Sequence, residues 1–181
     1  LLRRVAQPRA APQPRHRPAL GAGGARLNAM TADAREELRR LVHLSGRLLD
    51  DRRHDEFIAL FEPNGRYRVE VKAPELPNRM VWMALARDEL RERFDAVPEH
   101  EWRFTEQTRA IAVDAIDLAG EEARVAATVV VYQTDDLGRT ECYAVARYDD
   151  VWRRVEGAWK LAERTVDLRT RLLPVPSPLP I

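Results

Sequence analysis

The chain of 181 residues has a mass of 20.8 kDa, which fits one domain, and no apolar run approaches the roughly 18 residues of a membrane helix. Its net charge of +1 combines an acid-free segment, 1–29, that holds six arginines with a remainder of 24 basic and 29 acidic residues. The resulting charge of −5 on that remainder argues against a nucleic-acid-binding surface. A single cysteine, Cys142, excludes an internal disulfide and suits the reducing cytoplasm.

Residues 1–29 lack apolar periodicity, and prolines at positions 8, 12, 14 and 18 interrupt any helix. An arginine-rich segment without acids is also found in organelle transit peptides, but those peptides form an amphipathic helix. The first methionine, Met30, stands directly before a good helix start. We therefore predict a disordered leader over 1–29, and an upstream extension rather than a targeting signal.

The folded domain is predicted to span 30–171 and to begin with helices. Thr31 or Asp33 can cap a first helix, whose apolar residues recur at helical spacing as far as Leu49. The Pro63-Asn64-Gly65 sequence is expected to end a second, short helix and turn the chain. The remaining predictions for this half are a helix at 55–61, strands at 66–71 and 81–85, a loop at 73–79 and a helix at 87–94.

The second half of the domain is predicted to consist of strands. Turn-forming residues at 119–120, 135–138 and 156–157 separate four long stretches of strand-forming sequence. Tight connections between long strands predict an antiparallel meander. Helices followed by a meander predict an α+β fold: a cone-shaped, curved sheet, antiparallel or mixed, with the N-terminal helices on its concave face. The four strands are expected at 103–117, 121–134, 140–154 and 158–171.

This order of elements resembles the nuclear-transport-factor-2-like (NTF2-like) cone fold, which includes SnoaL-like proteins. Three stretches are similar to the β subunits of aromatic-ring-hydroxylating dioxygenases: LLDDRRHDEFIALFEPNGRYRV at 48–69, RDELRERFDAVPEHEWRFTEQTR at 87–109 and ARYDDVWRRVEGAWKLAERTVDL at 146–168. The third stretch is shared by stand-alone members of the cone fold, including dehydratase-like and isomerase-like enzymes. The second stretch, and the extension past the last strand, favour the oxygenase subunit.

The resemblance implies a non-catalytic β subunit that supports the catalytic α subunits of a Rieske-type oxygenase in aromatic catabolism. The implied assembly is a trimer of β chains beneath a trimer of α chains, α3β3, with the Rieske iron–sulfur cluster and the mononuclear iron on the α subunit. The residues agree, because a Rieske cluster takes two cysteines and two histidines. With one cysteine and with His43, His54 and His100 scattered along the domain, no cofactor or metal is expected on this chain.

An independent cone-fold enzyme of the dehydratase or isomerase type, or a binding protein, is the alternative function. Asp51, His54 and Tyr143 are its candidate catalytic residues, because a histidine beside a carboxylate can act as a general base on a small apolar substrate. A solvent-facing histidine among charges explains the same DDRRHDE sequence. Cys142 is predicted to be a small buried side chain. Three aromatic residues are predicted to pack in the core: Tyr148, Trp152 and Trp159.

Residues 172–181 alternate proline with apolar residues and are predicted to form an extended, polyproline-like segment, which we call the strap. We expect the strap to pack on a neighbouring subunit; the alternatives are that it crosses its own domain or that it is disordered. The expected subunit-interface residues are Arg169, Arg171, Leu172, Leu173, Val175, Leu179 and Ile181.

Overall fold

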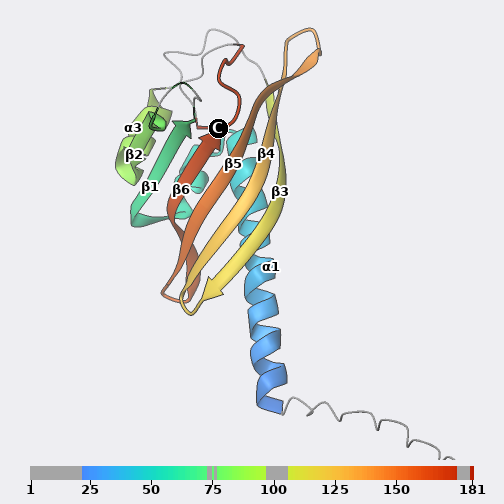
Figure 1. Cartoon of the computed structure of the whole chain (residues 1–181), viewed down its shortest axis with the longest axis vertical. Helices are drawn as coiled ribbons and strands as arrows, with labels where there is room; N and C mark the ends of the chain where they lie inside the picture. Colours follow the sequence, from blue (N-terminus) through green and yellow to red (C-terminus); the bar gives the residue numbers. More distant parts are fainter. Residues whose placement is uncertain (1–21, 73–74, 76, 97–105, 175–179) are drawn as a thin grey trace, which may run out of the picture.

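The computed structural model describes residues 22–72, 75, 77–96, 106–174 and 180–181, with the backbone alone for 22–29. Figure 1 shows one long, curved sheet with α1 lying across one of its faces. The helices are α1 (Ala22–Asp50), α2 (His54–Ala59) and α3 (Arg87–Asp95), and the strands are β1 (Phe61–Val71), β2 (Met80–Ala86), β3 (Glu106–Ala119), β4 (Glu122–Thr134), β5 (Thr140–Val155) and β6 (Ala158–Leu168).

The sheet has the strand order β2-β1-β6-β5-β4-β3. The four long strands β3 to β6 form antiparallel pairs in chain order, which confirms the predicted meander. Strand β1 pairs antiparallel with β2 and parallel with β6. The sheet is therefore mixed, and the predicted α+β class with N-terminal helices is confirmed.

Helix α1 begins at Ala22, eight residues before the predicted domain boundary at Met30. The end of the predicted leader, residues 22–29, thus belongs to the helix, although Gly23 and Gly24 in it are weak helix formers. Residues 1–21 lie outside the described residues. Further along α1, an added Cβ at Gly46 would lie 2.5 Å from Cδ1 of Ile111, so the absent side chain lets the helix pack closely on β3.

The prediction that Pro63-Asn64-Gly65 forms a turn was wrong, because β1 already starts at Phe61 and runs through it. The irregularity appears in the pairing with β6, where the register jumps between Phe61 and Arg66. Pro63 has no N–H to donate to a ladder. At Gly65, an added Cβ would lie 2.9 Å from the Glu62 carbonyl oxygen and 3.0 Å from that of Leu161. These residues therefore form a bulge inside the strand.

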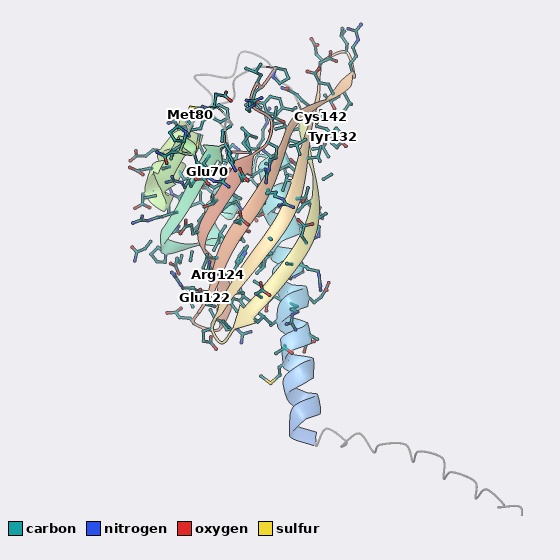
Figure 2. The ribbon with its side chains drawn as sticks, viewed as in Figure 1. Glu70, Met80, Glu122, Arg124, Tyr132 and Cys142 are labelled. Atoms are coloured by element: carbon teal, nitrogen blue, oxygen red, sulfur yellow. The ribbon has the colours of Figure 1, made fainter. Side chains whose placement is uncertain are left out.

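The core lies between the helices and the sheet face that they cover. Tyr148, Trp152 and Trp159 belong to it, as predicted from their alternation along β5 and β6. Burying side chains of this size stabilises the fold by about 1.5–3 kcal/mol each. Cys142, by contrast, is exposed, so its predicted burial was wrong. It pairs with the exposed Tyr132 on β4, and Figure 2 shows both near one end of the sheet.

Candidate functional site

A buried ion pair lies where α1 covers the sheet. Arg164 on β6 and Asp150 on β5 are direct cross-strand partners, which brings both side chains to the same face. Arg164 donates from Nε and Nη2 to the two carboxylate oxygens of Asp150 at 2.8 and 2.7 Å, and from Nη1 to Oγ of Ser45 on α1 at 2.9 Å. Burial opposes the guanidinium charge, but the contact with Asp150 outweighs it and raises the pKa of Arg164 above its ordinary value. Two parallel hydrogen bonds thus join the guanidinium to the carboxylate, which is the strong, bidentate form of this ion pair.

Two tyrosines stand beside this pair. Tyr67 on β1 is the register partner of Arg164, and the ring of Tyr148 on β5 lies under the guanidinium, with Cζ of Arg164 4.1 Å from the ring centroid. Both phenols donate to the carbonyl oxygen of Ile181 at 2.9 Å, and the Ile181 N–H donates to the Tyr67 oxygen at 3.0 Å. Burial raises the pKa of both tyrosines, so each phenol keeps its proton at neutral pH.

A second guanidinium lies at the same end of the sheet. Arg109 on β3 donates from its backbone N and from Nη1 to the two carboxylate oxygens of Asp50, the last residue of α1. Its Nη2 donates to Oε1 of Gln107 at 3.1 Å and to the carbonyl oxygen of Pro180 at 2.9 Å. Its Nε is buried, and no atom of the described residues accepts a hydrogen bond from it.

Together these side chains form what we call the inner polar cluster. Asp150 accepts from the Arg164 guanidinium at both oxygens, and Asp50 accepts from the Arg109 guanidinium at one oxygen and from the Arg109 backbone N–H at the other. The two phenols and Arg109 also donate to backbone atoms of the strap. The phenols and Arg109 therefore act as hydrogen-bond donors to the oxygens of residues 180 and 181. The cluster consists of Ser45, Tyr67, Arg109, Tyr148, Asp150 and Arg164.

The predicted catalytic residues lie elsewhere. Asp51 is exposed at the junction of α1 and α2, and His54, half-buried at the start of α2, stacks on Phe94 of α3 with ring centroids 4.1 Å apart. Tyr143 is buried on β5, whereas α2 packs on α1, α3 and β1. Strand β6 lies between β1, on which α2 packs, and β5, which carries Tyr143.

The two ends of the strap differ in burial, and Ile181 does not lie where we predicted. Ile181 is only 4% exposed and belongs to the core of its own chain, so the prediction that it packs on a neighbouring subunit is corrected. Leu173 is partly buried against the same core, and Leu172 is 89% exposed. Val175 and Leu179 lie outside the described residues. The exposed Arg169 and Arg171 form ion pairs with Asp167 at 3.0 Å and with Glu75 at 3.4 Å.

Metal and membrane features were sought in the described part of the chain. Over these residues, no group of three or more histidine, cysteine, aspartate or glutamate side chains is arranged to hold a metal ion. Within the same residues, no helix is both long and apolar enough to cross a membrane.

A model of the SnoaL-like domain family matches residues 30–165 of this chain. The chain belongs to the SnoaL-like domain family. The match begins at the predicted domain boundary and extends into β6, and a solved NTF2-like protein from Novosphingobium aromaticivorans has the same fold. The NTF2-like class expected for this member of the SnoaL-like family is therefore confirmed.

Known relatives of this SnoaL-like protein include oxygenase subunits. It is 26% identical over 163 residues to the methanesulfonate monooxygenase hydroxylase subunit β of Methylosulfonomonas methylovora, covering 84% of this chain and 90% of that protein. A structure described as the β subunit of an aromatic-ring-hydroxylating dioxygenase from N. aromaticivorans has a TM-score of 0.66 and 22% identity, over 78% and 92% of the chains. A structure described as a scytalone dehydratase from the same organism has a TM-score of 0.58 and 19% identity, over 79% and 89%.

Sequence reasoning missed the inner polar cluster, although one signal was present. Tyr148, Asp150 and Trp152 alternate along β5, so an acid stands on the same face as two core aromatics. A buried acid requires a cation, and Arg164 occupies the matching position on the next strand. No local signal in the sequence indicated that Ile181 accepts hydrogen bonds from the two phenols.

Proposed function

We propose that this chain is the β subunit of a Rieske-type ring-hydroxylating oxygenase, a subunit that supports the catalytic α subunits and carries no redox centre. The match to the methanesulfonate monooxygenase subunit carries the proposal, because it spans 84% of this chain and 90% of that protein. Because the match covers nearly the whole length of that subunit, it supports the role of an oxygenase subunit for this chain. The Rieske cluster and the mononuclear iron are proposed to belong to the α subunit.

For the substrate of the assembly we propose an aromatic compound. The support is the structural likeness to the subunit described as part of an aromatic-ring-hydroxylating dioxygenase. The name of the methanesulfonate monooxygenase subunit shows that a relative of this chain serves an enzyme with a small sulfonate substrate. The choice of substrate is therefore assigned to the α subunit. The single cysteine supports a cytoplasmic location.

One surface of the chain supports contact with another subunit. Strand β2 is an edge of the sheet, and three consecutive apolar residues on it, Met80, Val81 and Trp82, are 51%, 43% and 46% exposed. Figure 2 labels Met80 at this edge. An exposed apolar group on an unpaired strand edge is a typical protein-interaction site. We assign it to the α subunit.

Self-association as a β trimer, within an α3β3 assembly, is part of the proposal. After the correction for Ile181, the described interface candidates that remain exposed are Arg169, Arg171 and Leu172, of which Leu172 is 89% exposed. Burying so exposed an apolar side chain against a partner would contribute favourably to the free energy of association. Leu173, partly buried in its own chain, is proposed as a secondary contact.

Co-expression with a Rieske-type large subunit, to be sought among the neighbouring genes, tests the proposal. We expect the two chains to co-purify, with all iron and visible absorbance in the complex and none in the β chain alone. Failure to associate, or stoichiometric iron in the chain alone, would contradict the assigned function. Trp82→Glu should abolish co-purification while Tyr132→Glu, at an exposed aromatic on β4, should not. Retention of the complex by Trp82→Glu would contradict the assigned surface alone.

The second candidate function is a stand-alone enzyme or binding protein of the dehydratase type. The likeness to the structure described as a scytalone dehydratase favours it. Asp51, His54 and Tyr143 remain its proposed catalytic residues. Substitution of each by alanine tests the proposal against a panel of small apolar hydroxy compounds; turnover by the chain alone, lost on substitution of His54, would establish it.

A further inference from the structure

The inner polar cluster has properties of a ligand site that is already filled. We propose that it forms a binding site for a small branched aliphatic carboxylate, and that Pro180–Ile181 of the strap occupies this site as an internal ligand. The inference concerns the cone interior and goes beyond the proposed subunit function, on which it does not depend.

Three side chains from three strands converge on two successive backbone carbonyls. Tyr67 and Tyr148 donate to the Ile181 oxygen at 2.9 Å each, and Arg109 donates to the Pro180 oxygen at 2.9 Å. The Tyr67 oxygen also accepts from the Ile181 N–H at 3.0 Å. Figure 1 shows the C-terminal end of the chain beside the end of β6. The strap is thus bound at its end in the way that a small polar ligand is bound.

The donors are fixed by the body of the domain. Tyr67 and Tyr148 are 1% and 0% exposed, and Arg164, which lies over the Tyr148 ring, is itself held by Asp150. Arg109 is held by Asp50 from α1. None of these supports belongs to the strap, so we expect the donors to keep their positions when the strap is absent. Without an acceptor, however, the buried phenols would be unsatisfied, which is unfavourable.

The donor set favours an anionic acceptor group. Two phenols and Arg109 offer protons to the same small volume, and Arg109 Nε adds a buried donor that has no acceptor among the described residues. A carboxylate offers two oxygens with about four acceptor positions, so one carboxylate can accept from both phenols and from Arg109. Hydrogen bonds to a charged acceptor are also stronger than those to a neutral one.

The apolar half of the ligand is defined by the side chain that now fills it. Ile181 is 4% exposed and packs in the main core cluster. A ligand that replaces it must present a branched aliphatic group of similar size, because both a cavity and an overfilled core are unfavourable. The compound 3-methylpentanoate meets both requirements, since it is isoleucine without the amino group. Binding of such a ligand and of the strap would be mutually exclusive.

A chain that lacks residues 174–181 tests the proposal. The probe is a peptide of the sequence PVPSPLPI, labelled at its N-terminus and followed by fluorescence anisotropy, with unlabelled 3-methylpentanoate as competitor. We expect saturable binding to the shortened chain, no binding to the full chain, and displacement by 3-methylpentanoate. The combined Tyr67→Phe and Tyr148→Phe substitutions should weaken peptide binding by at least about tenfold, because the three hydrogen bonds that the phenols make to the isoleucine are lost. Tyr132→Phe is the matched control and should change nothing.

A chain that lacks only Pro180 and Ile181 replaces the shortened chain if the latter does not fold, because it removes the two residues that occupy the site. Equal binding of the peptide to the unmodified full chain would overturn the proposal by placing the site elsewhere. Absence of binding to both variants, or an equal effect of the Tyr132 control, would overturn it as well. Binding of the peptide without displacement by 3-methylpentanoate would refute the carboxylate as ligand.

Discussion

Tyr67 and Tyr148, on strands β1 and β5, donate to the same carbonyl oxygen of Ile181 at 2.9 Å each. Strand β6 lies between their strands and carries Arg164. The guanidinium lies over the ring of Tyr148 and is held by Asp150. One end of the chain is therefore fixed by residues that a buried ion pair positions.

Removal of either phenol should weaken the fold measurably. Tyr148→Phe removes one hydrogen bond to Ile181, and Tyr67→Phe removes two, because the Tyr67 oxygen also accepts from the Ile181 N–H. We expect the free energy of unfolding to fall by about 0.5–1.5 kcal/mol for each bond lost. Urea denaturation at pH 7 measures the change. Tyr132→Phe, on an exposed tyrosine, is the control, and a loss of similar size in that variant would show that the Ile181 contact is not the cause.

The buried ion pair should be sensitive to the loss of one partner. Arg164→Met leaves Asp150 buried without its cation, and we expect the free energy of unfolding to fall by about 3–5 kcal/mol. Adding Asp150→Leu to that variant should recover much of the loss, because no buried charge is then unpaired. Arg153→Met, in which an exposed guanidinium paired with Glu62 and Glu122 is removed, should change stability little. Thermal or urea unfolding of these three variants and of the unmodified chain decides between these outcomes.

Substitution by alanine should destabilise the chain much more at Ile181 than at Leu172, the two ends of the strap. Ile181→Ala removes core contacts, and we expect it to destabilise the chain by about 2–5 kcal/mol. Leu172→Ala, at a position 89% exposed, should cost less than about 0.5 kcal/mol in the monomer. If the two substitutions had equal effects in urea denaturation of the isolated chain, Ile181 would not be packed in its own domain.

Stability should decline in alkaline solution because of the same tyrosines. Burial raises the pKa of Tyr67 and Tyr148 above the value of about 10 expected in the unfolded chain. The stabilisation from each protonated phenol is thus complete below about pH 10 and is lost as the pH rises further, since only the unfolded chain releases these protons. The unfolding free energy measured from pH 8 to 11 should fall less steeply in the Tyr67→Phe, Tyr148→Phe double variant. Equal slopes would contradict burial of the two phenols.

The sequence by itself determined the order and type of most elements. Period-two alternation in β4, β5 and β6, with glycines at the turns between them, predicted the meander because both signals are local. The same local patterns carried the resemblance to the SnoaL-like family, and the match over 30–165 confirms it. Local signals failed at Pro63-Asn64-Gly65, where pairing with β6 keeps a turn-like sequence inside a strand.

Only the tertiary structure decided what fills the cone and which charges meet there. Asp150 and Arg164 become partners because the β5–β6 register, with its shift between Val151 and Trp152, turns both toward α1. A shift of one residue would have placed them on the outer face. The position of Ile181 depends on contacts with Tyr67 and Tyr148, which lie 114 and 33 residues away along the chain. Such contacts leave no periodic trace in a sequence, because they depend on how strands distant along the chain are brought together.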